Sequence, residues 1–150
     1  MIGPSPNASR ILWVVESTSR WCDAARRFVG PFQHIDHDPS TQPIVVRSIE
    51  LGKVRAAIAG TATTAILWEI SSDTLTETAL VIAQIGATRS TVLQLAATGD
   101  RSTKGLERCL MELGVRGVLR QPEQLATFAR LVHRFFDSTG RTKAIASDRP

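Results

Sequence analysis

The sequence predicts an α/β fold, in which helices cover both faces of a parallel β-sheet. Short β-branched runs alternate along the chain with segments whose apolar residues recur at helical spacing, which is typical of repeated βα units. Five such pairs can be counted. The first run, residues 11–15 (ILWVV), is apolar throughout, as expected of a central strand that is covered on both faces.

The first half of the chain predicts three strands and two helices. The strands cover residues 11–15, 44–49 (IVVRSI) and 64–70 (TAILWEI). Residues 18–29 carry one apolar face, and Gly30 followed by Pro31 ends that helix. Residues 50–59 form a shorter helix that stops at Gly60. The intervening stretch, residues 31–43, is rich in turn formers and is interpreted as a loop.

The second half predicts three helices and two strands. Asp73 or Thr74 caps the third helix, and Thr74 with Glu77 has the spacing of a capping box. The strands cover residues 91–96 and 117–120, with the fourth helix between them. The last helix carries an apolar stripe over residues 125–135. Right-handed crossovers then give a flavodoxin-like (βα)5 three-layer sandwich with strand order 2-1-3-4-5.

Length and composition favour a single domain. The chain has 150 residues, 43% of them hydrophobic and 21% charged, and no apolar run long enough to cross a membrane. We expect a flexible N-terminus over residues 1–10, one domain over 11–137 and a disordered tail over 138–150, because the tail lacks an apolar stripe. No basic region followed by an apolar stretch opens the chain, so a cytoplasmic location is expected.

Charge, aromatic content and cysteine usage argue against a nucleic-acid surface and against a functional role for the cysteines. The net charge is +4, but the basic residues are scattered: Arg20, Arg26 and Arg27 lie on one predicted helix, and Arg130, His133 and Arg134 on another. Aromatic residues make up only 5% and tyrosine is absent, so solvated basic faces are favoured over a nucleic-acid surface. Cys22 and Cys109 are interpreted as reduced packing residues on helices.

Three segments, in the right order, resemble the receiver domains of two-component response regulators. Residues 112–122 (ELGVRGVLRQP) are similar to the family's acidic and glycine-containing stretch, short strand and Lys-Pro pair. Residues 63–71 (TTAILWEIS) are similar to the strand that ends in the phosphoacceptor aspartate, and residues 11–17 (ILWVVES) to the first strand with its paired acids. The resemblance covers most of residues 11–136 and implies the receiver fold.

The resemblance also shows which residues of the phosphorylation site have changed. Phosphoryl transfer to a carboxylate requires a nucleophilic aspartate, a cation held by clustered carboxylates, and fixed donors to the phosphoryl oxygens. The positions that match this machinery hold other residues: Val15 and Glu16 for the acid pair, Glu69 for the acceptor, Ala96 for the hydroxyl, Gln121 for the lysine and Val118 for the switch aromatic. Glutamate places its oxygens one methylene too far for in-line attack, and an error near 1 Å costs about a hundredfold in rate.

These departures predict a degenerate receiver that is not phosphorylated and is not an enzyme, with no cofactor. Pro122 is kept, and the resemblance implies a cis bond between Gln121 and Pro122. Glu69 could mimic a phosphorylated aspartate, although it lacks a nearby lysine or hydroxyl partner. Glu16 and Glu69 could together hold a divalent cation, but two carboxylates alone make a weak site. His34, Asp36, His37 and Asp38 have metal-ligand chemistry without rigid spacing, so a solvated loop is favoured there.

The leading functional hypothesis is a phosphorylation-independent module that binds another signalling protein. The resemblance implies that the fourth and fifth helices and the strand between them carry the interaction, and the residues expected there are Val118, Arg120, Arg130 and Arg134. The same helices could instead form a homodimer. The alternative is a small-ligand-binding domain whose crevice, at the carboxyl ends of the strands, is lined by Glu16, Glu69, Thr98 and Gln121. Nucleic-acid binding through the basic helices is the third possibility.

Overall fold

The computed structural model describes residues 10–30, 43–61, 63–98 and 105–147, with side chains up to residue 138. It contains one five-stranded sheet in the order β2-β1-β3-β4-β5, and each neighbouring pair of strands is parallel. The strands are β1 (Arg10–Val15), β2 (Ile44–Ile49), β3 (Thr64–Glu69), β4 (Val92–Ala97) and β5 (Gly117–Leu119). The predicted strand order is confirmed.

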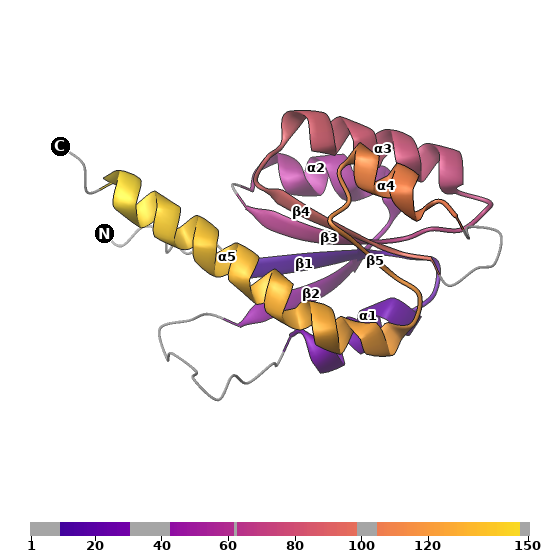
Figure 1. The fold of residues 1–150 in the computed structure, drawn as a ribbon, viewed down its shortest axis with the longest axis horizontal. Helices are drawn as coiled ribbons and strands as arrows, with labels where there is room; N and C mark the ends of the chain where they lie inside the picture. The colour runs from indigo at the N-terminus through magenta and orange to yellow at the C-terminus, as the bar shows by residue number, and fades with distance from the viewer. Residues whose placement is uncertain (1–9, 31–42, 62, 99–104, 148–150) are drawn as a thin grey trace.

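Helices form a layer on each side of the sheet (Figure 1). The helices are α1 (Arg20–Phe28), α2 (Val54–Ala59), α3 (Leu75–Thr88), α4 (Glu107–Leu113) and α5 (Leu125–Ser147). Short 3-10 helices, η1 (Leu51–Lys53) and η3 (Pro122–Gln124), lead into α2 and α5. Figure 1 shows α2, α3 and α4 above the sheet and α1 and α5 below it, so the three-layer arrangement is confirmed.

Two hydrophobic cores follow from the alternation of side chains along the strands. One core lies between the sheet and the layer of α1 and α5, and it contains Leu12, Leu67 and Leu95. The other, under α2, α3 and α4, is centred on Ile66 and Trp68, which is fully buried. A polar network crosses the second core, because Trp68 Nε1 donates to Gln94 Oε1 at 2.9 Å and Gln94 Nε2 donates to the Ile82 carbonyl oxygen at 3.2 Å.

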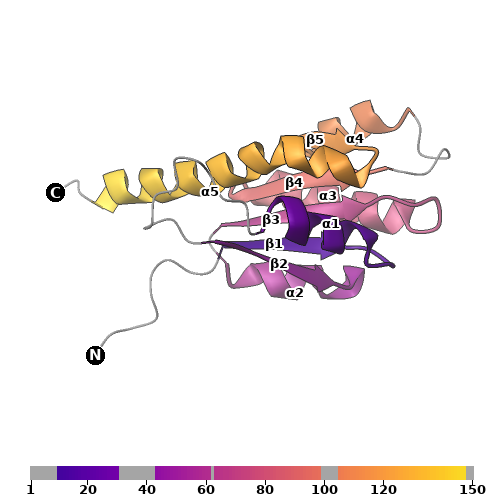
Figure 2. The ribbon, with the colours of Figure 1, turned by 90° about the horizontal axis from the view of Figure 1, so that it is seen from below.

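The predicted disordered tail is wrong over residues 138–147. Helix α5 continues to Ser147 and projects past the amino edge of the sheet (Figures 1 and 2). Extending a helix that is already formed avoids the unfavourable nucleation step, so a segment without an apolar stripe can still be helical. Residues 1–9 and 148–150, the remainder of the predicted termini, lie outside the described residues.

Several local predictions also need correction. Cys22 is buried as expected, but Cys109 is exposed, because the seven-residue α4 buries only Leu110. His133 is not on a solvated basic face, since it is buried and its Nε2 lies 3.1 Å from the Val29 carbonyl oxygen. Thr74 is the N-cap of α3, but no capping box forms, and its hydroxyl shares a hydrogen bond with Ser71.

Candidate functional site: the carboxyl edge of the sheet

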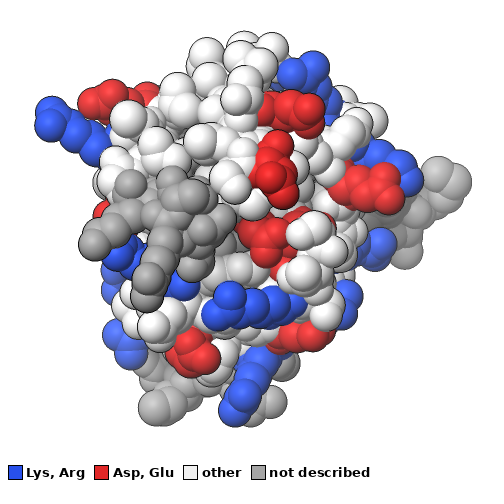
Figure 3. Space-filling view, turned by 90° about the vertical axis from the view of Figure 1, so that its right-hand side faces the viewer, with Lys and Arg blue, Asp and Glu red and all other residues white. Residues whose placement is uncertain are grey.

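One row of residues crosses the carboxyl edge of the sheet. Val15 pairs with Trp68, so the next residues, Glu16 and Glu69, are neighbours. Glu69 pairs with Ala97, which in turn pairs with Leu119. The two carboxylates that the sequence indicated are thus brought together. Figure 3 faces this edge and shows several acidic side chains near its middle.

The strand register places two alanines, Ala96 and Ala97, at the end of β4. Ala96 pairs with Trp68 and belongs to the core under α2, α3 and α4, as does Val15. Ala97 is the residue beside Glu69 on β4, one position beyond the predicted Ala96. Both are alanine, so neither brings a hydroxyl to Glu69. Thr98 directly follows the end of this strand, but it is only 6% exposed.

Glu16 serves as the cap of helix α1. Its two carboxylate oxygens accept hydrogen bonds from the backbone N–H groups of Trp21 at 2.8 Å and Cys22 at 2.7 Å. The first N–H groups of a helix have no partner within the helix, and the helix dipole favours a negative charge beside them. The N-cap residue, Ser19, makes no such bond with its own side chain. The carboxylate of Glu16 therefore stabilises the start of α1, at a position where the resemblance suggested a cation ligand.

Burial raises the pKa of the Glu16 carboxyl above its ordinary value, although the N–H groups of Trp21 and Cys22 act in the opposite direction and Glu69 adds a smaller increase. A carboxyl whose pKa is raised by folding binds protons more tightly in the native state than in the unfolded state. The free energy of unfolding must therefore fall as the pH rises from the ordinary pKa of glutamate through the raised value.

Glu16→Gln removes this titration and keeps one oxygen acceptor. We expect the wild type to lose stability relative to the variant as the pH rises from the ordinary pKa of glutamate through the raised pKa of Glu16, because only the wild type gains a partly buried charge there. Urea unfolding of both proteins at each pH measures the difference. A gap that moves the other way, in favour of the wild type as the pH rises, would contradict the assignment.

Glu69 is held by the loop that follows β1. Its Oε1 accepts hydrogen bonds from the Ser17 hydroxyl at 3.1 Å and from the Ser17 backbone N–H at 3.3 Å. Sequence reasoning did not identify Ser17, since a serine in a connecting loop has no distinctive signal. Both carboxylates are thus bonded to donors that follow β1: Glu16 to the first turn of α1, and Glu69 to Ser17 in the loop.

At the position that resembles the receiver lysine, Gln121 is exposed and stands at the start of η3. Oε1 of Gln124 accepts a hydrogen bond from the Gln121 N–H at 2.9 Å. The predicted cis bond is wrong: every peptide bond in the described ranges is trans, including that between Gln121 and Pro122. Pro122 instead begins a helical turn, a position for which its fixed φ is suited.

One of the four residues predicted to line a ligand crevice borders a hollow at this edge of the sheet. A hollow of about 310 Å³ lies beside β2 and is lined by Glu16, Ser48, Ile49, Glu50 and Lys53. Glu16 is the one predicted crevice residue that lines it. Across the described ranges, no group of three or more histidine, cysteine, aspartate or glutamate side chains is placed to hold a metal ion. The loop cluster of His34, Asp36, His37 and Asp38 lies outside the described residues.

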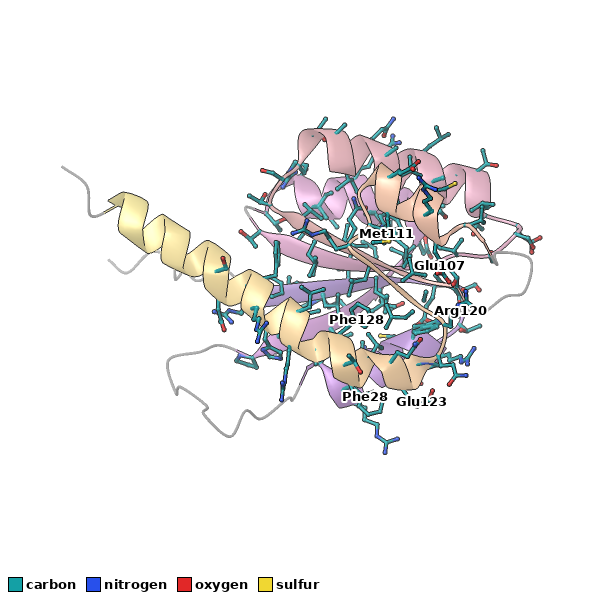
Figure 4. The ribbon with its side chains drawn as sticks, viewed as in Figure 1. Phe28, Glu107, Met111, Arg120, Glu123 and Phe128 are labelled. Carbon is teal, nitrogen blue, oxygen red and sulfur yellow. The ribbon has the colours of Figure 1, made fainter. Side chains whose placement is uncertain are left out.

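The predicted interaction residues do not share one surface. Val118 is half-buried on the edge strand β5, where Gly117 faces the ring of Phe128 (Figure 4). Arg120, just beyond β5, forms an ion pair with Glu107 at the start of α4, with Nε 2.8 Å from Oε1. Arg130 is exposed on α5, but it lies about 200° around the helix from Phe128 and therefore away from β5.

Arg134 is likewise exposed on the outer surface of α5. The flank of the sheet beside β5 carries different residues. Met111 on α4 is 55% exposed, and Phe128 on α5 is half-buried. Met111, Val118 and Phe128, with the Arg120–Glu107 pair at one end, make up what we call the β5 flank (Figure 4). Sequence reasoning missed Met111 and Phe128, because each fits a helical pattern of core residues equally well.

Comparison with known proteins bears on the fold. The structure is similar to the crystal structure of a CheY-like protein, TadZ, from Pseudomonas aeruginosa PAO1, with a TM-score of 0.61 and 13% sequence identity. The match covers 84% of this chain and 94% of that one. No protein-family model and no curated protein sequence matches the chain. The chain thus has a receiver-like, CheY-like fold. No helix in the described ranges has the length and apolar character needed to cross a membrane.

Proposed function

We propose that this chain is a phosphorylation-independent, degenerate receiver domain that acts by binding another signalling protein. The single observation that carries the proposal is the bonding of the two carboxylates at the sheet edge. Glu16 accepts two backbone N–H groups of α1, and Glu69 accepts the hydroxyl and N–H of Ser17. Glu16 stabilises the start of α1, and Glu69 holds the loop after β1. These structural roles explain why the two residues are present even if the chain has no phosphorylation chemistry.

The neighbours of Glu69 support the loss of that chemistry. A phosphoryl group on this residue would need a cation and donors beside it to take up its negative charge. Its strand neighbour is Ala97, whose methyl group donates no hydrogen bond. Gln121 stands where the receiver lysine is expected and carries no charge. Without these partners, Glu69 also has no means to act as a phosphate mimic that pulls a switch, so the proposal does not assign it that role.

The β5 flank supports the binding role. An edge strand leaves backbone groups unpaired on one side, and here it is short, with only three residues. The exposed Met111 and the half-buried Phe128 add apolar surface on either side of it. Methionine and aromatic residues are enriched at protein interfaces. A partner protein that covers this flank is favoured over one that binds Arg130 and Arg134, which lie on a different surface.

Phosphotransfer tests the proposal directly. We expect the full chain, incubated with acetyl phosphate and Mg²⁺, to show no gain of a phosphoryl group by intact-mass spectrometry, because alanine and Gln121 stand at the positions that match the hydroxyl and the lysine which stabilise the transferring group in receivers. A phosphorylatable receiver in the same reaction is the positive control, and Glu69→Ala is the matched negative control. A phosphorylated species that forms on the wild type and disappears in Glu69→Ala would reject the proposal.

A further inference from the structure

A groove on the α2–α3 side of the molecule has the features of a second binding surface. The groove has a volume of about 350 Å³ and runs between η1–α2 and α3; it is lined by Leu51, Gly52, Arg55, Glu77, Leu80 and Val81. Leu80 is 59% exposed, more than any other large apolar side chain in the described ranges. A strongly exposed leucine at the rim of a hollow, with further apolar side chains below it, is typical of a protein-binding surface.

The charges at this groove indicate what binds there. Arg55 on the α2 wall and Glu77 on the α3 wall are both exposed, and neither forms an ion pair with another described residue. Opposite charges on opposite walls make the groove complementary to itself. A two-fold axis along the groove would place Arg55 of one copy opposite Glu77 of the other, which is the residue exchange that an isologous interface requires.

We propose that two copies of this chain associate through this α2–α3 groove. Leu80 of each copy would pack against the α2 wall of the other, beside Leu51, while the two Arg55–Glu77 pairs fix the register at the rim. The interface would leave the β5 flank open, because that flank is formed by α4, β5 and α5. The inference therefore goes beyond the proposed partner binding and does not depend on it.

Sedimentation velocity of the full chain over a range of concentrations tests the proposal. We expect a reversible monomer–dimer equilibrium for the wild type. Leu80→Asp should raise the dissociation constant by about tenfold or more, because burial of a leucine side chain is lost and a charge is buried instead. Met111→Asp is the matched control, since Met111 has a similar exposure on α4, and it should leave the equilibrium unchanged.

Charge reversal gives a second readout. Arg55→Glu and Glu77→Arg should each weaken the dimer by about fivefold, and the double variant should restore it, because the pairs re-form with exchanged charges. Circular dichroism confirms that each variant is folded, as expected for exposed positions. A wild type that stays monomeric at about 1 mM would overturn the proposal, since even weak association shows at that concentration. A dimer weakened by Met111→Asp but not by Leu80→Asp would also overturn it, in favour of the fourth and fifth helices.

Discussion

Trp68→Ala is expected to lower the free energy of unfolding by about 3–5 kcal/mol, a large part of the total stability of a domain of this size. The indole ring is fully buried between the sheet and the layer of α2, α3 and α4, so its removal leaves a cavity in that core. The change also removes the donor to Gln94 Oε1, and Gln94 is itself buried. Urea unfolding followed by circular dichroism measures the loss.

Trp68→Phe is the control that separates packing from hydrogen bonding. Phenylalanine keeps most of the buried ring but cannot donate to Gln94, so the expected loss is about 1–3 kcal/mol, the cost of leaving a buried acceptor unsatisfied. Because Trp68 immediately precedes Glu69, its ring could instead cover a surface pocket beside that carboxylate. A tryptophan in that role would tolerate replacement by alanine. A loss below about 1 kcal/mol for Trp68→Ala would therefore contradict its assignment to the core.

Gly86→Ala is expected to destabilise the protein by about 1–3 kcal/mol, although alanine in place of glycine ordinarily favours a helix by about 1 kcal/mol. Gly86 lies in α3 where the end of α4 approaches closely. A Cβ at this position would clash with the Leu113 carbonyl oxygen and would lie 3.4 Å from the Gly114 Cα. Both are backbone atoms, so α3 and α4 must move apart to admit the methyl group.

Gly52→Ala provides the matched control for this prediction. Gly52 lies in η1, and a Cβ there would have no atom within 4 Å. The thermal midpoint of the Gly52→Ala variant is expected to stay the same as that of the wild type or to rise, because alanine restricts the conformations of the unfolded chain. If Gly86→Ala were as stable as Gly52→Ala in differential scanning calorimetry, the close approach of α3 to α4 would be wrong.

The strands could be predicted from the sequence because their chemistry is local. A run such as residues 64–69 is buried on both faces of a parallel sheet, and its apolar character is continuous for that reason. Strand ends were less well determined: β4 covers residues 92–97, one residue beyond the prediction. The residue that pairs with Glu69, Ala97, lies just beyond the predicted end of that strand, and the pairing could not be predicted because register is set by hydrogen bonds between strands.

The role of Glu16 could not be predicted in the same way. An acidic residue at the end of a strand is equally suited to a metal site and to a helix cap, and the choice depends on the path of residues 17–19. The sequence did hold a signal, since an acid a few residues before a helix is favoured by the helix dipole. The exposure of Cys109 was missed because two turns of helix are too short to define a periodic face.

The carboxylates of Glu16 and Glu69 are bonded to the protein's own donors, and a magnesium titration followed by amide NMR tests most directly whether they are thereby kept from holding a cation. The amide signals to observe are those of Ser17, Trp21 and Cys22, whose N–H groups bond to the two carboxylates. We predict that these signals stay in place up to about 10 mM Mg²⁺, well above the dissociation constants of functional divalent-cation sites. Saturable shifts of these three signals at lower concentrations would show a working cation site and contradict the account.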